Sequence, residues 1–280
     1  MSAVVKEPEV AVEAKPLATG LSSSLTGGIV WPLLSGAIGL GLWEGLVRFF
    51  KVPIFILPPP SQIFLTIVNQ AGFLLTQLAI TILAALIGLV VAVLFGLAAG
   101  AAVTMSRLVD RMLTPWLVIA HAVPKVVIAP LFLVWFGFGL QSEVFFVVAF
   151  TFFPVIVNTV TGLKSADPEQ VLMVRAMGAT PGQILRKIQF PSALASICAG
   201  IKLAVTLAPV GAVIGEFVAS NQGLGHLLIR AVGDMDTPLA FAAVTVFSIF
   251  GVLVWRLAEW GERRLLPWHP SQRDIPGRAM

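Results

Sequence analysis

Residues 164–191 read KSADPEQVLMVRAMGATPGQILRKIQFP and form a long polar segment between two strongly apolar ones. Its 28 residues far exceed the ~2–8 residues that usually connect neighbouring helices of a bundle. Its helix-forming runs are too regular for a flexible linker. We therefore expect this segment to be folded and to contact another protein.

Helix-start and helix-stop residues divide the segment into two short helices. Asp167 or Ser165 can cap the first helix, with Pro168 in its first turn and Gly178 at its end. A second helix is expected to start after Thr180-Pro181, and Pro191 then opens the next apolar stretch. Two short helices across a membrane surface would form a rigid projection suited to a groove in a soluble partner.

Composition predicts an all-α integral membrane protein. Hydrophobic residues make up 58% of the 280 residues and charged residues 11%, whereas a soluble domain carries about 25% charged residues. The apolar stretches are continuous or helical in period and do not alternate as strands of a membrane barrel do. Stretches long enough to cross a bilayer predict about six spans, at residues 28–47, 73–105, 112–138, 144–163, 193–214 and 239–255.

The distribution of basic residues predicts the topology. Of the 18 lysines and arginines, 13 fall on the side that holds both chain ends and the polar segment, while Arg48, Lys51 and Arg230 fall on the other side. Basic residues concentrate in cytoplasmic loops, so both termini and the segment should be cytoplasmic. The same placement explains the net charge of +4 without a nucleic-acid partner.

The domain organisation follows from these spans. Residues 1–27 contain several charges and no uninterrupted apolar core of a signal peptide, so they are expected to form a disordered cytoplasmic tail. Residues 28–260 should form the transmembrane domain, including two cytoplasmic helices within 165–190. Residues 261–280 should form a second cytoplasmic tail.

Two predicted spans carry small residues at four-residue spacing, which lets helix backbones approach closely in lipid. Both helices are expected in the bundle interior or at a dimer seam. The rows are Gly88, Ala92, Gly96 and Gly100 in one span, and Gly200, Ala204 and Ala208 in the other, which continues after a three-residue step with Gly211 and Gly215.

Polar side chains at membrane depth are costly and are candidates for a solute path. Lys125 follows Pro124 in a stretch that two prolines interrupt, so it either lines a cavity or binds carbonyls that the prolines free. Lys202 can line the path or snorkel to the inner surface. Glu216, near the outer end of the same span, is a gate residue or an interfacial anchor. Lys202 and Glu216 lie about 21 Å apart along the axis of their span, so they cannot pair with each other. Asn158 is expected to hydrogen-bond between helices.

One connection on the outer side should form a short surface helix. Pro58-Pro59-Pro60 precedes Ser61, which is expected to act as its N-cap. Its apolar face is predicted to contain Ile63, Phe64, Ile67 and Val68.

The sequence offers little for catalysis. It contains no Gly-Lys-Ser/Thr of a phosphate-binding loop, and its single cysteine, Cys198, provides no metal cluster. We expect no cofactor and no enzymatic activity, so ATP-driven transport would need a separate ATPase subunit.

The polar segment also resembles a known signature. Gly178, nine residues and Ile188-x-Phe190-Pro191 match the cytoplasmic loop of binding-protein-dependent ABC importer permeases, written Glu-Ala-Ala, three residues, Gly, nine residues, Ile-x-Leu-Pro. Residues 172–174 and Phe190 depart from it. The resemblance implies that the segment couples to an ATPase, through Glu169, Arg175, Gly178, Ala179, Thr180, Ile188 and Pro191.

Other motifs are similar to one branch of that family, whose members take up nitrate, sulfonates, taurine or bicarbonate. They are Val123-Pro124-Lys125, Gly215-Glu216-Phe217 and Gly223-Leu224-Gly225, within a resemblance that covers about residues 53–268. They look most similar to members proposed to carry thiamine-precursor pyrimidines or riboflavin.

The family implies a type I importer in the inner membrane of a bacterium. Two permease subunits, here two copies of this chain, would bind two cytoplasmic ATPase subunits and an extracytoplasmic solute-binding protein. A passive channel or secondary carrier would also explain the spans and Lys125, but it gives no reason for the polar segment. An intramembrane enzyme would need a paired nucleophile and base, which the sequence lacks.

Overall fold

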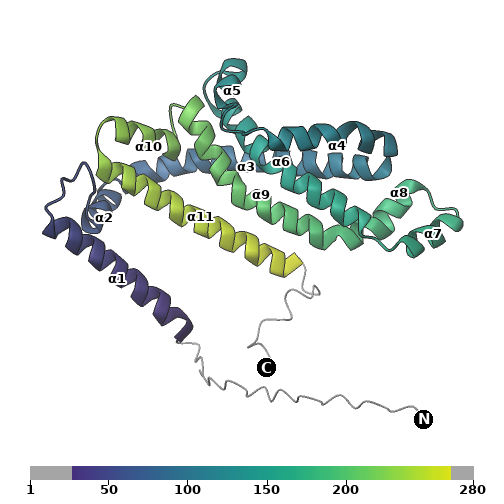
Figure 1. Ribbon diagram of the computed structural model, residues 1–280, viewed down its shortest axis with the longest axis horizontal. Helices are drawn as coiled ribbons and strands as arrows, with labels where there is room; N and C mark the ends of the chain where they lie inside the picture. Colours follow the sequence, from purple (N-terminus) through teal and green to yellow (C-terminus); the bar gives the residue numbers. More distant parts are fainter. Residues whose placement is uncertain (1–26, 266–280) are drawn as a thin grey trace, which may run out of the picture.

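The computed structural model describes residues 27–265, whose regular elements are all helical (Figure 1). Five helices in this range are long and apolar enough to cross a membrane. They are α1 (Gly27–Phe49), α3 (Ala71–Met105), α6 (Leu140–Lys164), α9 (Phe190–Ala219) and α11 (Thr237–Leu265). The all-α membrane fold is thus confirmed, while the predicted tails lie almost entirely outside the described residues.

Seven shorter elements connect or flank these helices. They are α2 (Pro60–Asn69), α4 (Arg107–Ala122), α5 (Ala129–Phe136), α7 (Pro168–Ala176), α8 (Pro181–Ile184), the π-helical turn η1 (Leu185–Gln189) and α10 (Leu224–Gly233). Helices α7 and α8 lie at one end of the molecule, and α2 and α10 lie at the opposite end (Figure 1).

The centre of the bundle is α6, which packs between α3 and α9. The α3 row of small residues faces α6 so closely that a Cβ added at Gly96 would lie 2.6 Å from Val155 Cγ1. On the other side, a Cβ at Gly200 would lie 2.6 Å from Asn158 Cβ. Such distances allow no side chain, so both glycine rows serve close packing inside this chain, as the spacing predicts.

The α2–α10 end has its own hydrophobic cluster. It brings together side chains of α2, α3, α10 and α11, namely Ile63, Leu74, Leu224, Leu227, Ala242 and Ala243. Helix α1 joins this end through its last turns, where Val47 is 5% exposed and Trp43 packs against Phe241 with ring centroids 5.8 Å apart. The rest of α1 lies apart from the bundle (Figure 1).

The expected single span at 112–138 is wrong, because this stretch consists of two helices and a break. Helix α4 ends at Ala122, and Val123 is extended with φ −69° and ψ 127°, as expected for a residue before proline. At one end, Lys164 Nζ of α6 lies 3.1 Å from Asp110 Oδ2 of α4. At the other end, Gly139 N donates to Ala219 O of α9 at 2.7 Å. The stretch from α4 through the break to α5 therefore leads from one end of the molecule to the other, and we call it the broken crossing.

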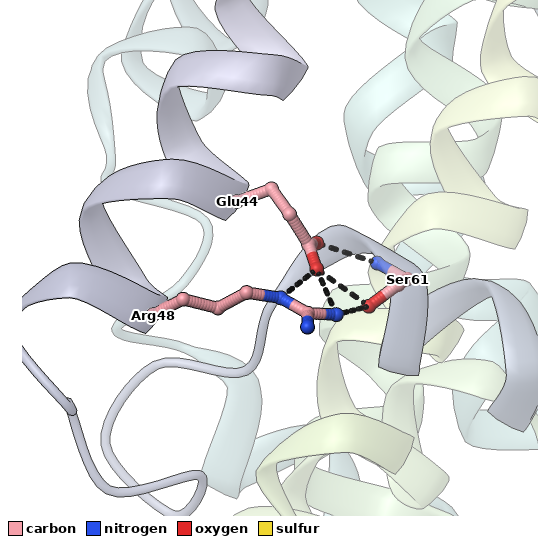
Figure 2. Close-up of polar contacts among 3 residues, drawn as sticks. All are labelled: Glu44, Arg48 and Ser61. Atoms are coloured by element: carbon pink, nitrogen blue, oxygen red, sulfur yellow. Dashed lines mark hydrogen bonds and ion pairs between the residues drawn. The ribbon is translucent and has the colours of Figure 1, made fainter.

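The short helix α2 also differs from expectation at its start. Pro59 occupies the N-cap position, and Ser61 instead donates its backbone N–H to Glu44 Oε2 of α1 at 3.0 Å (Figure 2). Of the predicted apolar face, Ile63 is buried in the cluster, whereas Phe64 is 65% exposed. A glutamate of the preceding span, which the sequence reasoning missed, thus caps this helix.

Candidate functional site

Helix α7 has well-defined caps at both ends. Asp167 Oδ1 accepts from Glu169 N at 2.9 Å, which assigns the N-cap to Asp167. At the other end, Gly178 has φ +85°, its N–H donates to Arg175 O at 3.0 Å, and Ala179 N donates to Val174 O at 3.2 Å. This pair of bonds is a Schellman motif, which ends a helix where glycine adopts a positive φ. The predicted helix and its stop at Gly178 are confirmed.

Helix α8 begins with a capping box, as the Thr180-Pro181 pair suggests. Gln183 N donates to Thr180 Oγ1 at 3.4 Å, and Thr180 N donates to Gln183 Oε1 at 2.9 Å. The prediction that this helix is short and that Pro191 opens a new span is wrong, because α8 continues through η1 into α9 as one helix over Pro181–Ala219. Pro191 has no N–H and its ring needs extra room, which the wider π-helical turn before it can supply.

The segment from α7 to η1, residues 168–189, presents an exposed surface that contains both apolar and charged side chains. Leu172 and Met173 of α7 and Met177 at its C-cap are 62%, 60% and 78% exposed. Glu169 and Arg175 are exposed beside them. Ile184 is buried, while Ile188 is half-buried. Grouped apolar side chains within a charged rim are typical of a protein interaction site.

An ion pair that the sequence reasoning missed ties α4 to the base of this segment. Asp110 accepts from Thr114 Oγ1 at 2.7 Å and from Lys164 Nζ at 3.1 Å. The hydrogen bond from Thr114, followed by that from Lys164, lowers the pKa of Asp110 below its ordinary value. Lys164 is the last residue of α6, so the pair joins the broken crossing to the start of the polar segment.

Lys125 lies in the break between α4 and α5, beside aromatic rings of α6. Its Nζ is 5.7 Å from the centroid of the Phe150 ring, within the range of a cation–π contact. The His121 ring, one turn earlier, stacks on Phe153 with centroids 3.7 Å apart. Pro124 next to the lysine is exposed. The break thus places one cation and several flat rings together.

Lys202 and Asn158 both have partners within the chain. Lys202 Nζ lies 2.6 Å from Glu262 Oε2 of α11, with side-chain exposures of 30% and 25%. As predicted, Lys202 does not pair with Glu216. The expected interhelical bond of Asn158 is not found, because its Nδ2 donates to Pro154 O of its own helix at 2.8 Å.

Glu216 is fully buried and is therefore not an interfacial anchor. Its Oε2 accepts from Gly225 N, in the first turn of α10, at 2.6 Å. A Cβ built at Gly223, where φ is +94°, would lie 2.3 Å from the carboxyl carbon of Glu216. Only a residue without a side chain leaves room for the carboxylate there. A carboxylate at this place also complements the positive end of the helix dipole.

Two further side chains complete this cap, and neither was predicted. Gly223 N donates to Gln77 Oε1 at 2.6 Å, and Leu224 N donates to Thr81 Oγ1 at 3.0 Å. Together with Glu216, these groups of α3 and α9 satisfy three successive N–H groups that a helix start leaves unpaired. The start of α10 is thereby fastened to two spans.

The comparison with protein families identifies the chain. A family model described as "binding-protein-dependent transport system inner membrane component" matches residues 92–267. The chain belongs to this family. The match confirms the resemblance of residues 178–191 to the importer permease signature.

Individual relatives of the permease transport chemically different solutes. This chain is 34% identical to the formylaminopyrimidine transport permease ThiX of Halalkalibacterium halodurans, over 82% of this chain and 92% of the relative. It is 36% identical to the riboflavin permease RibX of Chloroflexus aurantiacus, over 86% and 92%. Identity to the taurine permease TauC of Escherichia coli is 29%, over 83% and 87%.

Solved structures support the fold. A chain of the inward-facing MetNI methionine ABC transporter is 20% identical with a TM-score of 0.57, covering 69% of this chain and 96% of that chain. A chain of an amino acid ABC transporter is 18% identical with a TM-score of 0.59, covering 72% and 98%. The permease therefore has the type I importer fold and is the membrane subunit of an ABC importer.

Proposed function

We propose that two copies of this permease form the path of an ATP-driven importer for a planar nitrogen heterocycle, of the thiamine-precursor pyrimidine or riboflavin type. Two cytoplasmic ATPase subunits would bind the α7–η1 segment, and an extracytoplasmic protein would deliver the solute. The observation that carries the proposal is the unbroken helix from Pro181 to Ala219, which links the exposed segment directly to a span.

The continuity of this helix supports a coupling mechanism. A displacement of α8 by an ATPase moves α9, because no flexible joint separates them. Helix α9 packs on α6 without room for a side chain at Gly200, so α6 follows. The exposed residues Glu169 and Arg175, with Leu172, Met173 and Met177, supply the contact surface, while Gly178, Ala179, Thr180, Ile188 and Pro191 set its shape.

The proposed orientation places both termini and the α7–α8 end in the cytoplasm of a bacterium, with α2 and α10 outside the inner membrane. The asymmetry of basic residues supports it. After Cys198 is replaced, a cysteine at Gln183 should react with a membrane-impermeant thiol reagent only in inverted vesicles. Strong labelling of that cysteine in intact cells would contradict the orientation.

The broken crossing is the proposed seam between the two copies. Helix α4 has no fully buried residue, and its Met112 and Trp116 are 64% and 70% exposed. Val134 and Trp135 of α5 are 77% and 62% exposed. An exposed apolar surface that includes large aromatic side chains can be covered by a second copy of the chain. Lys125 lies in the same stretch and would thus face the path between the copies.

The other polar residues of the spans would shape the path without contacting solute. Lys202 holds α9 to α11 through Glu262, and Asn158 lies against Gly200 where α6 and α9 meet. Glu216 fixes α10 at the outer end, so α10 would form the rim of an outer gate.

The aromatic surroundings of Lys125 favour a flat heterocycle as solute. The Phe150 ring lies beside Lys125. The His121 ring, one turn earlier in α4, stacks on Phe153 of α6, and flat rings of this kind stack on flat ligands. The relatives that transport an aminopyrimidine and riboflavin are 34% and 36% identical. The positive charge of Lys125 supports a second candidate, a small solute that carries an anionic group, such as nitrate, a sulfonate, taurine or bicarbonate.

Uptake into proteoliposomes that contain the whole complex separates these possibilities. Lys125→Met removes the charge and keeps most of the stem, and Arg256→Met is the control, since Arg256 is an exposed cation on α11, outside the proposed seam. If Lys125 faces the solute, its variant should assemble and keep basal ATPase activity but import poorly. Wild-type import by this variant would refute the path assignment, and failed assembly would indicate a structural lysine.

The solute is best identified through the binding protein that works with this permease. The melting temperature of that binding protein should be measured with an aminopyrimidine, with riboflavin and with taurine, because a ligand stabilises the protein that binds it. Stabilisation by taurine alone would favour the anion alternative. Solute entry that needs no ATPase subunit would instead indicate a passive channel or secondary carrier.

A further inference from the structure

A cavity of about 630 Å³ opens between the end of α1 and the helix α2. Two cations and four neutral polar side chains line it, together with apolar walls that include Val47 and Leu65. The polar lining consists of Arg48, Lys51, Ser61, Gln62, Thr66 and Asn69. A cavity of this kind offers hydrogen-bond donors and positive charge beside an apolar surface.

Arg48 is held in place by its neighbours (Figure 2). Its Nε donates to Glu44 Oε1 at 2.6 Å, and its Nη2 donates to Ser61 Oγ at 3.3 Å. Ser61 Oγ and Ser61 N also donate to Glu44, at 2.8 and 3.0 Å. Glu44 thus accepts from both neighbours, whereas the Arg48 guanidinium has five N–H donors. The remaining donors of Arg48, whose side chain is 68% exposed, are available to a ligand.

Lys51 adds a second positive charge that no residue within 27–265 neutralises by an ion pair. It follows the end of α1, where Val52 N donates to Val47 O at 3.1 Å. Its φ of +50° is a conformation that favours glycine over residues with a side chain. The chain thus places a lysine where glycine would be less strained. The charged groups at this cavity are thus two cations, Arg48 and Lys51, and one carboxylate, that of Glu44, which binds Arg48.

We infer that this cavity binds the phosphate group of an anionic phospholipid in the leaflet at the α2–α10 end. Arg48 and Lys51 provide the charge, and Ser61, Gln62 and Asn69 provide neutral polar groups for the rest of the headgroup. Phosphate and arginine form charge-assisted hydrogen bonds that are stronger than neutral ones.

The apolar surface below the cavity distinguishes a lipid from a free anion. Helix α1 leads away from the cavity, and its Leu33, Ile38 and Leu42 are each more than half exposed. Acyl chains can cover this surface while the phosphate stays in the cavity. Free phosphate would use the cations but leave the apolar walls, including Ile54 and Val52, uncovered.

The full-length permease in nanodiscs with equal phosphatidylglycerol and phosphatidylethanolamine tests the inference. The lipids that remain bound after gentle extraction are quantified by mass spectrometry. Wild type should retain phosphatidylglycerol preferentially. Lys51→Gln should lower that preference about fivefold, the factor that corresponds to ~1 kcal/mol for one basic residue at an anionic surface. Lys51→Arg should keep it.

Two further variants isolate the charge from other effects. Lys51→Gly removes the charge and relieves the positive φ, so it should also lose the preference even if Lys51→Gln folds poorly. Arg230→Gln removes another exposed cation at the same end, which lies outside the cavity, and should leave the preference unchanged. Unchanged phosphatidylglycerol retention in both Lys51→Gln and Lys51→Gly would overturn the inference.

Two competing occupants give different results. If inorganic phosphate raises the melting temperature of wild type as much as phosphatidylglycerol does, the cavity is a site for free anions and the lipid assignment is wrong. If the Lys51 variants weaken only the docking of the extracytoplasmic binding protein, the cavity recognises acidic side chains of that protein, and the lipid assignment is again wrong.

Discussion

Replacing Gly178 with valine should uncouple the permease without unfolding it. Gly178 has φ +85°, and a Cβ built there would meet nothing within 4 Å, so the cost is entirely a backbone cost. An L-residue in this conformation costs about 1–2 kcal/mol, which shifts an equilibrium by a factor of about 5–30. The Schellman end of α7 would therefore give way to other conformations, while the distant bundle stays intact.

The matched control is Gly182→Val, four residues further along the same segment. Gly182 also has open space around its Cβ position, but its φ is not positive. Solute-stimulated ATPase activity should fall about tenfold in Gly178→Val, at normal membrane abundance, and stay near wild type in Gly182→Val. Normal stimulated activity and normal ATPase assembly in Gly178→Val would refute the role of this turn in coupling.

Three other perturbations test the packing and the ion pairs. Gly96→Leu should prevent α3 from reaching α6 and cost at least the ~1–3 kcal/mol typical of overpacking, seen as a lower melting temperature. Gly72→Leu on the same helix has open space and should be tolerated. A double-mutant cycle of Lys202→Met and Glu262→Gln should give about 1–3 kcal/mol of coupling, between the values for exposed and buried pairs; a coupling near zero would show that the pair adds nothing to stability. The pKa of Asp110 is lowered in the folded protein. Its ion pair should therefore contribute equally to the free energy of unfolding from about pH 5 to pH 8. That contribution should be lost only as the pH falls through the lowered pKa of Asp110. If wild type lost thermal stability between pH 8 and pH 6 and the Asp110→Asn variant did not, this pH dependence would be contradicted.

The features that sequence predicted well are local ones. The caps of α7 and α8 depend on residues within four positions of each other, such as Asp167 with Glu169 and Thr180 with Gln183. The glycine rows were equally readable, because a small residue every four positions has one main use in a membrane helix. Hydropathy located five of the predicted spans, although α9 and α11 extend beyond the predicted ranges 193–214 and 239–255.

The features that sequence missed depend on contacts between distant residues. Gln77 caps Gly223, which lies 146 positions away, and no local pattern marks such a pair. Glu216 looked solvent-accessible because it lies near the end of a span, but the turn at Gly223 folds back over it. The break at residues 123–128 was visible as two prolines, yet hydropathy alone joined α4 and α5 into one span.

The distribution of tight contacts indicates where the permease can deform during transport. Helices α3, α6 and α9 touch at positions that admit no side chain, for example Gly96 and Gly200, so a close-packed core of this kind moves as one body. The helix over Pro181–Ala219 has 39 residues, about 58 Å at 1.5 Å per residue, and it spans this body from the coupling segment to the opposite end. Helix α4 has no buried residue and is followed by the break that holds Lys125. A push on α8 would therefore move the three-helix body as a unit, and the broken crossing beside it is the part of the chain that can change shape around a solute.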